Sequence, residues 1–296
     1  MSFFYLCDKI KLGDDMKKIM ISFFILILIL ILILFYSRYV GTTGLNIKEY
    51  KVNYSELKED FYGLKIAHIS DIHYKSTISK EELNKLVKKI NLTKPDIVVL
   101  TGDLFTDKDI TDNDEKDIID ALSKINVNIE KYAIKGDNDS DKWDNIINSS
   151  GFKNLNNTYD LIYTETTDYI LIAGMSSNIT DKTSIEEKLK TTNEFIANSE
   201  IKPNYNILLM HEPDFVNNFD YSKFNLILAG HSLNGQVRIP YVGGLFKQVY
   251  SKKYYEEYYK LKNTDLYISS GLGTYKYSFR LFNHPSFNLY RLTNKQ

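Results

Sequence analysis

Cysteine is almost absent from this chain of 296 residues: Cys7 is its single example, so no disulfide framework can form within the chain. An excess of charge of either sign is also lacking, because 37 Lys and Arg nearly balance 38 Asp and Glu, for a net charge of −1. Without a basic stripe, we expect no nucleic-acid partner. No internal period indicates a repeat architecture. The informative features are one long apolar run and six short ones.

The long apolar run extends from Ile19 to Tyr36, with Ser22 as its one polar residue and no charge. At about 1.5 Å per helical residue, it nearly crosses a hydrocarbon core of about 30 Å. A cleaved signal peptide is less favoured, because the run is long for such a segment and Ser37-Arg38-Tyr39 is a poor cleavage site. A buried core helix is weaker still, because the run has no polar face. We therefore predict an uncleaved transmembrane anchor over residues 19–36.

The charges that flank this run predict its orientation. Four lysines precede it and Arg38 alone follows it closely, although Lys48 and Lys51 lie within reach. The four are Lys9, Lys11, Lys17 and Lys18. The positive-inside rule places residues 1–18 in the cytoplasm as a tail and the rest of the chain outside, as a single-pass protein of the cell membrane. Residues 37–60 are expected to be a polar connector, and residues 61–296 one extracellular α/β domain.

Six short apolar runs each end abruptly in acid, histidine or glycine. The runs are 66–70, 97–101, 132–135, 207–210, 226–229 and 266–270. Apolar runs of this length without alternation are typical of strands that are covered on both faces. Ligands of open α/β sheets bind just beyond the carboxyl ends of such strands. We therefore expect the polar residues after the runs to meet at one edge, where they would form a metal-centred active site.

Helical patterns separate the runs in the first half of the chain. Apolar residues recur at helical spacing between Ser79 and Pro95, and again within about 114–125, 140–149 and 184–198. Segments 161–163 and 169–173 indicate a hairpin, and the predicted short strands further on are 236–239, 265–269 and 287–291. This mixture predicts an α/β fold in which two mixed sheets pack face to face, with helices outside them.

The residues that follow the runs are of the types that divalent metals prefer. Taken singly, an aspartate after a strand is commonly a helix cap, and a lone histidine such as His68 or His284 is more often structural. Five such sites in sequence order favour the functional interpretation. Two metals about 3.5–4 Å apart need oxygen and imidazole ligands and one carboxylate that bridges them. The candidates are Asp71, His73, Asp103, Asp137, Asn138, Asp139, His211 and His231.

At these residues the chain resembles the calcineurin-like metallophosphoesterases, and in particular their small membrane-associated bacterial branch. The resemblance covers about residues 63–292. The matching motifs are 69–73, 100–104, 211–214 and 229–231, and the segments 235–240 and 270–273 are also similar. The resemblance implies a four-layer α/β/β/α fold and two divalent metal ions, which would be Mn, Fe or Zn.

The same resemblance implies a role for each motif position. The expected ligands are Asp71 and His73 for one metal, His211 and His231 for the other, Asp103 as the bridge, and Asp137 as a further ligand. Asp103, Asn138 and Asp139 stand at the positions of catalytic residues. A metal-activated hydroxide would attack the phosphorus of a phosphomonoester or phosphodiester substrate.

Two motif positions depart from the resembled family. Asn138 replaces the histidine that would protonate the leaving group, a service worth about 10²–10⁴ in rate that an amide cannot perform. Leu233 replaces a histidine ligand of the first metal, and Asn234 is the nearest polar substitute. Two functions therefore stay open. One is a membrane-anchored phosphoesterase that acts on an envelope lipid or wall component. The other is a degenerate member that binds a phosphate ligand or a partner with little turnover.

Overall fold

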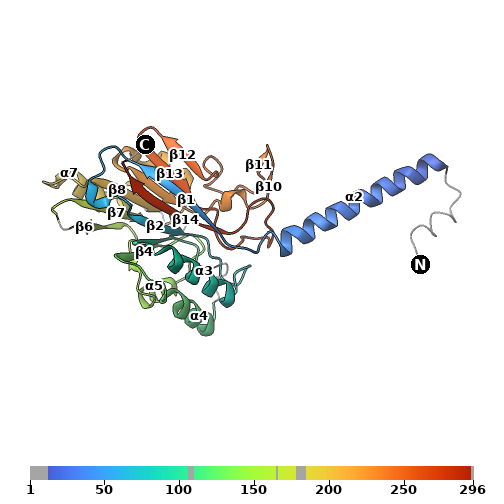
Figure 1. Ribbon diagram of the computed structural model, residues 1–296, viewed down its shortest axis with the longest axis horizontal. Helices are drawn as coiled ribbons and strands as arrows, with labels where there is room; N and C mark the ends of the chain where they lie inside the picture. Colours follow the sequence, from blue (N-terminus) through green and yellow to red (C-terminus); the bar gives the residue numbers. More distant parts are fainter. Residues whose placement is uncertain (1–12, 106–109, 165, 178–184, 295–296) are drawn as a thin grey trace.

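The computed structural model describes residues 13–105, 110–164, 166–177 and 185–294. Within them, two six-stranded sheets pack face to face, and one long helix extends away from the sheets (Figure 1). Cys7, Lys9 and Lys11 lie outside the described residues, so the structure does not bear on the predicted tail.

The first sheet has the strand order β1-β14-β2-β3-β4-β5 and is mixed. Strands β2 to β5 are parallel, β14 is antiparallel to β2, and β1 is parallel to β14. The strands span Asn46–Asn53 (β1), Lys65–Ile69 (β2), Ile97–Thr101 (β3), Glu130–Ile134 (β4), Lys153–Asn154 (β5) and Ser286–Thr293 (β14).

The second sheet has the order β12-β13-β9-β8-β7-β6, in which the four central strands are parallel and the two edge strands antiparallel to their neighbours. Its strands span Thr158–Tyr163 (β6), Tyr169–Met175 (β7), Tyr205–Met210 (β8), Leu226–Ala229 (β9), Tyr258–Leu261 (β12) and Thr264–Ile268 (β13). Strands β6 and β7 form the predicted hairpin. A separate small ribbon joins Arg238–Ile239 (β10) to Gly243–Gly244 (β11).

The apolar runs lack alternation because both faces of each sheet are buried. Along β3, Ile97 and Val99 face the second sheet, whereas Val98 and Leu100 face the helices on the opposite side. The helices Lys80–Thr93 (α3), Asp112–Leu122 (α4) and Trp143–Ser149 (α5) cover the first sheet, and Ile185–Lys188 (α6) and Lys190–Asn198 (α7) lie on the second. The predicted four-layer α/β/β/α fold is confirmed.

The helix ends follow from local side-chain chemistry. Ser79 caps α3 by accepting a hydrogen bond from the Glu82 amide, and the helix ends at Lys94, whose left-handed conformation precedes Pro95. Thr111 and Asp114 form a reciprocal capping box at the start of α4, which begins two residues before the predicted position. Asp114 thus stabilises the N-terminus of α4.

Three predicted elements differ from the observed ones. Strand β1 lies inside the expected connector 37–60 and pairs along its whole length with β14, so the first sheet takes an edge strand from that segment. The helix predicted at 184–198 is broken at Leu189 into α6 and α7, and residue 184 lies outside the described part. The strand predicted at 236–239 is reduced to β10, because Leu233–Gly235 and Gln236 adopt turn geometry.

The N-terminal helix, Asp14–Tyr39 (α2), is long and apolar enough to cross a membrane. Its last turn contacts the domain: the Ser37 carbonyl accepts a hydrogen bond from the Arg280 amide at 2.9 Å. A side chain at Gly41 would have no room, because its Cβ would lie 1.8 Å from the Arg280 carbonyl oxygen. The helix and the domain are therefore joined by close backbone packing.

Candidate metal centre

The candidate ligands meet at the carboxyl ends of strands from both sheets. Strands β2, β3 and β4 bring in Asp71, His73, Asp103 and Asp137, and strands β8 and β9 bring in His211 and His231. Two groups of residues each offer ligand atoms that lie within 4.8 Å of one another. The groups are Asp71, His73 and Asp103, and Asp103, Asp137, His211 and His231. Asp103 belongs to both, which is the position that a bridging carboxylate requires.

Four of the six candidate ligands have left-handed backbone conformations. Their φ angles are 50° at Asp71, 44° at His73, 55° at Asp103 and 65° at His231. Non-glycine residues rarely adopt this conformation, and such residues cluster where the surrounding structure holds a functional side chain in a set direction. The sharp turns at the strand ends aim these side chains into the space between the two sheets.

Glycines next to the ligands allow backbone segments to approach closely. Gly102 has φ +89°, and a Cβ there would lie 2.7 Å from the His211 Nδ1 and 2.7 Å from the Gly136 Cα. A Cβ at Gly230 would lie 2.0 Å from the Ser70 Oγ. These positions therefore have no space for a side chain, which explains why a glycine precedes Asp103 and His231.

Each candidate histidine uses one ring nitrogen on a backbone carbonyl. The Nδ1 of His73 donates to the Phe105 carbonyl at 3.1 Å, and the Nδ1 of His211 donates to the Thr101 carbonyl at 2.6 Å. The Nε2 of His231 donates to the Val249 carbonyl at 2.7 Å. Since a carbonyl can only accept, the other nitrogen of each neutral ring carries a lone pair toward the cluster, as a metal ligand must.

The carboxylates lie opposite these lone pairs. The His73 Nε2 is 3.8 Å from the Asp71 Oδ1 and 3.7 Å from the Asp103 Oδ2, and it is fully buried without a hydrogen-bond partner among the described residues. The Asp137 Oδ1 is 3.0 Å from the His211 Nε2 and 3.2 Å from the His231 Nδ1. A buried nitrogen without a partner is costly. A cation between His73 and the two carboxylates would satisfy it, so the residues fit a metal.

The cluster concentrates negative charge in a buried space. Burial raises the pKa of Asp71, against the attraction of His211. Burial also opposes ionisation of Asp103, but His211 and His73 together leave the pKa of Asp103 lowered. Burial would lower the pKa of His211, but Asp103 and Asp137 raise it well above its usual value. A positive charge is therefore strongly favoured here, and divalent cations can supply it.

Two residues predicted as catalytic contact Asp103 or its backbone. The Asn138 amide nitrogen and its Nδ2 donate to the two Asp103 carboxylate oxygens at 3.0 and 2.8 Å. The Asp139 carboxylate instead accepts from the amides of Asp103, Leu104 and Gly136, at 2.7–3.0 Å. Burial, then Asp103, raises the pKa of Asp139 to about 7. Asp139 thus links the loop that carries Asp103 to the loop that carries Asp137, and its catalytic role stays a prediction.

The other residues discussed from the sequence, His68, Leu233, Asn234 and His284, lie outside the two ligand groups. His68 faces the space between the sheets, with its Nε2 2.8 Å from the Thr101 Oγ1, and it belongs to neither group. Leu233 is buried, and its Cδ2 and the Asp71 Cβ both border the space above Gly271. The Asn234 side chain is engaged by Glu257 and Arg238, so it does not replace the missing ligand. His284 is also in neither group.

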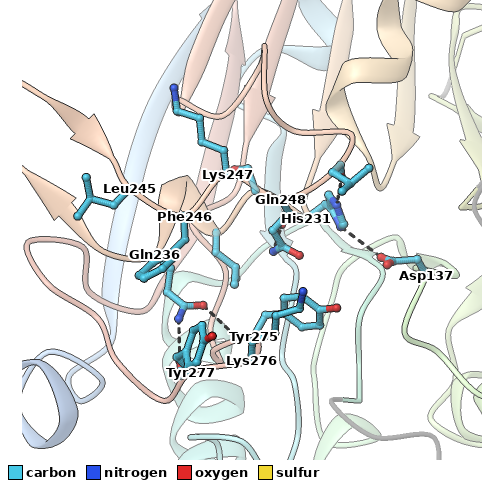
Figure 2. Close-up of a pocket in the computed structure, with 13 residues that line it drawn as sticks. Asp137, His231, Gln236, Leu245, Phe246, Lys247, Gln248, Tyr275, Lys276 and Tyr277 are labelled. Carbon is cyan, nitrogen blue, oxygen red and sulfur yellow. Dashed lines mark hydrogen bonds and ion pairs between the residues drawn. The ribbon is translucent and has the colours of Figure 1, made fainter.

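A cleft of about 450 Å³ opens beside the second group. Figure 2 shows Asp137 and His231 on one side of it and Leu245 and Phe246 on the other. Its lining also includes Lys247, Gln248, Val249 and the segment 275–277. The sequence motifs gave no signal for these residues, because none of them is of a metal-ligand type.

Fold and site together define a metallophosphoesterase-type protein, with two mixed sheets that meet at a carboxylate and histidine cluster. A sequence model of the calcineurin-like phosphoesterases matches residues 64–235, more than half of the chain, and the chain therefore belongs to this family. The predicted resemblance is confirmed.

Relatives of the chain include two bacterial proteins. The chain is 27% identical over 262 residues to the uncharacterized metallophosphoesterase YkuE of Bacillus subtilis, covering 87% of this chain and 88% of the relative. It is 29% identical over 245 residues to the uncharacterized metallophosphoesterase Cj0846 of Campylobacter jejuni, covering 80% of this chain and 60% of that protein.

A vertebrate protein is also similar. The chain is 23% identical to a transmembrane protein with metallophosphoesterase domain from Danio rerio, covering 79% of this chain and 54% of that protein. Among solved structures, TT1561 of Thermus thermophilus matches with a TM-score of 0.46 and 14% identity, over 71% of this chain and 90% of that one. The apolar helix and the transmembrane relative together indicate association with a membrane.

Proposed function

We propose that this chain is a membrane-anchored, metal-dependent phosphoesterase that hydrolyses a phosphomonoester or phosphodiester. The observation that carries the proposal is the shared Asp103, which lies in both ligand groups. The unpartnered Nε2 of His73 supports it further, because a buried imidazole that faces two carboxylates suits a cation better than an empty space. Two divalent ions, Mn, Fe or Zn, fit this set of oxygen and nitrogen donors.

The proposed ligand set follows the two groups. Metals bound there would polarise the phosphoryl oxygens and activate a water molecule for attack on phosphorus. Asn138 donates two hydrogen bonds to the Asp103 carboxylate. These bonds hold the carboxylate in its place between the two ligand groups. Lys247 and Lys276 line the cleft and attract an anionic substrate.

The leaving group receives no proton from Asn138, because an amide is not an acid at neutral pH. Its Nδ2 is moreover directed at Asp103. We therefore propose that the preferred substrates have leaving groups that depart readily as anions. An aryl phosphodiester should consequently be hydrolysed much faster than an alkyl one, by more than the 10²–10⁴ that a general acid supplies.

A degenerate binding module is the second candidate, and Leu233 is the observation that favours it. Its apolar side chain borders Asp71, where the family has a histidine, and Asn234 does not compensate. Loss of one metal would leave a site that binds phosphate without efficient turnover.

Metal content and hydrolysis of the purified full-length protein distinguish these functions. We expect two metal ions per chain after loading with Mn²⁺, and hydrolysis of bis(4-nitrophenyl) phosphate that chelation removes. A protein that holds no metal, or that holds metal and binds phosphate but hydrolyses neither monoesters nor diesters, would be the degenerate module.

We also propose that the domain lies outside the cell and the tail in the cytoplasm, on the basis of the lysines that precede α2. Protease added to intact cells should then degrade the domain and spare the tail around Cys7. Protection of the domain until the cells are lysed would reverse this orientation.

A further inference from the structure

Exposed apolar side chains gather on one edge of the domain. Seven of them lie within residues 239–250, and two more follow at 277 and 282. We call this set the apolar edge: Ile239, Tyr241, Val242, Leu245, Phe246, Val249, Tyr250, Tyr277 and Phe282. Val242 is 67% exposed and Tyr241 is fully exposed. Single exposed apolar residues are ordinary, but a contiguous group indicates an interaction surface.

The two segments of the apolar edge form one surface. The Arg238 amide donates to the Leu281 carbonyl at 2.9 Å, and Val237 and Leu281 form an isolated bridge. The rings of Phe246 and Tyr277 have their centroids 5.8 Å apart. The β10–β11 ribbon and the segment 277–282 are thus held together by backbone and ring contacts.

The apolar edge is continuous with the end of the membrane helix. Arg280 lies within its second segment, and the Arg280 amide donates to the carbonyl of Ser37. Ser37 directly follows the apolar run that ends at Tyr36, so its contacts lie at the level of the membrane surface. Figure 1 shows β10 and β11 on the side of the domain that faces α2.

The charges beside the apolar edge suit a lipid surface. Lys247 and Lys276 are next to its apolar residues in the chain, Lys252 follows two residues after Tyr250, and no acidic residue occurs between 239 and 253. Glu256, which borders Tyr241 and Val242, is neutralised by an ion pair with Arg238 at 2.7 Å. The Lys247 Nζ lies 3.8 Å from the centroid of the Tyr255 ring. Tyrosine and lysine beside apolar side chains are typical of membrane interfaces, where lysines attract anionic headgroups.

Part of the apolar edge also lines the cleft of the candidate metal centre. Leu245, Phe246, Val249 and Tyr277 belong both to the apolar edge and to the cleft wall, and the cleft reaches Asp137 and His231. A surface that touched the apolar edge would therefore lie at the mouth of the cleft (Figure 2).

We propose that the apolar edge docks on the bilayer from which α2 emerges, so that the phosphoester headgroup of a membrane lipid enters the cleft from the membrane surface. The docking is inferred only from the exposure of the apolar edge, its contacts with the end of α2 and its position on the side of the domain that faces α2. The choice of a lipid substrate rests on the proposed phosphoesterase function.

Depth-dependent fluorescence quenching tests the docking in the full-length protein. In a Cys7→Ser background, Val242→Cys carries an environment-sensitive label, and the protein is reconstituted in nanodiscs of phosphatidylcholine and phosphatidylglycerol. Lipids with a nitroxide on the acyl chain should quench this label several-fold more than the same label at Ile201→Cys. Ile201 is also exposed and follows α7, which Figure 1 shows on the side of the domain away from α2.

Two outcomes would overturn the docking. Equal quenching at the two positions would leave the apolar edge in water. Protection of the Val242→Cys label from aqueous iodide without quenching by the lipid nitroxide would assign the surface to a second copy of the chain or another protein.

Hydrolysis of a matched pair of substrates tests the lipid assignment. A nitrophenyl phosphodiester with acyl chains, inserted in the nanodisc, is compared with bis(4-nitrophenyl) phosphate in water. The double variant Tyr241→Ser, Val242→Ser should lose several-fold of its activity on the inserted substrate and none on the soluble one, since neither residue lines the cleft. Equal loss on both substrates would overturn the lipid assignment. If neither substrate is hydrolysed even by the unaltered protein, the proposed function fails, while the quenching result stands independently.

Discussion

The two halves of the candidate metal centre, one on each side of Asp103, differ in how close their histidine nitrogens lie to carboxylate oxygens when no metal is bound. In the half formed by Asp137, His211 and His231, each ring nitrogen that faces the cluster has a carboxylate within 3.2 Å. In the half formed by Asp71 and His73, the His73 Nε2 has no hydrogen-bond partner within the described part of the chain, and the nearest carboxylate oxygens are 3.7 and 3.8 Å away.

This difference shows that the number of ligands a half offers and the degree to which its buried polar atoms lack partners without a metal are separate properties. The Asp137 half offers four residues when Asp103 is counted, whereas the Asp71 half offers three and is bordered by Leu233. More ligands bind a metal more tightly, so the Asp137 half should fill first. The Asp71 half is the one whose geometry is unsatisfied without a cation, because its histidine has no alternative partner.

Asp103→Asn should have the largest effect, because this residue is the one that the two halves share. An amide carries no charge and presents only one oxygen, so both metals should lose a ligand. We expect less than one metal per chain and hydrolysis reduced at least 10³-fold. Metal analysis after dialysis and activity at saturating Mn²⁺ measure this, with His68→Gln as the histidine control. Full metal content in Asp103→Asn would mean that the halves do not share this carboxylate.

Replacing one histidine in each half should show which metal-binding step belongs to which half. His211→Ala should weaken the first, tighter binding step in a metal titration to about the affinity of the second, because three donors then remain in that half, as many as the Asp71 half offers. His73→Ala should leave that step intact and remove only the weaker one. Calorimetric titration with Mn²⁺ resolves the two steps. Loss of the same step in both variants would contradict the division of the cluster into two halves.

Leu233→His should act on the Asp71 half alone, and more weakly. The Leu233 side chain borders Asp71, and its backbone has φ 48°, a conformation that histidine tolerates better than leucine. An added imidazole should therefore tighten the weaker metal about tenfold and raise hydrolysis at limiting Mn²⁺. Leu233→Met, of similar volume but no imidazole, is the matched control. Coinciding metal dependence of Leu233→His and the unaltered protein would place Leu233 away from the ligand position.

The strands and the ligand residues were predictable because both depend on local sequence. Apolar runs such as 97–101 are long enough to be buried on both faces, and five of the six end at a turn that carries a candidate ligand. Strand β1 was missed because its burial alternates without a matching apolar pattern in the sequence: the inward positions include Lys48, whereas Ile47 is exposed. Its partner β14 is also more than 200 residues away in the chain. The hydrogen bonds of Asp139 could not be predicted, because three amides from two loops meet its carboxylate only in the folded state.

The smallest effect concerns His68, a histidine close in sequence to the centre but outside both halves. Burial lowers the pKa of His68 to about 3, from an ordinary value of 6.5, so the folded protein holds this ring neutral. The unfolded chain binds a proton below pH 6.5 and the folded chain does not, so the contribution of His68 to stability is present above pH 6.5 and is lost as pH falls toward 3.

His68→Gln should remove this pH-dependent loss of stability. The difference in unfolding free energy between the two proteins should therefore shift by about 1 kcal/mol per pH unit between pH 6 and 4 and stay constant above pH 7. Fluorescence of the single tryptophan, the buried Trp143, follows unfolding in detergent. A constant difference across the whole range would mean that His68 titrates normally, in contact with water, and does not lie between the sheets.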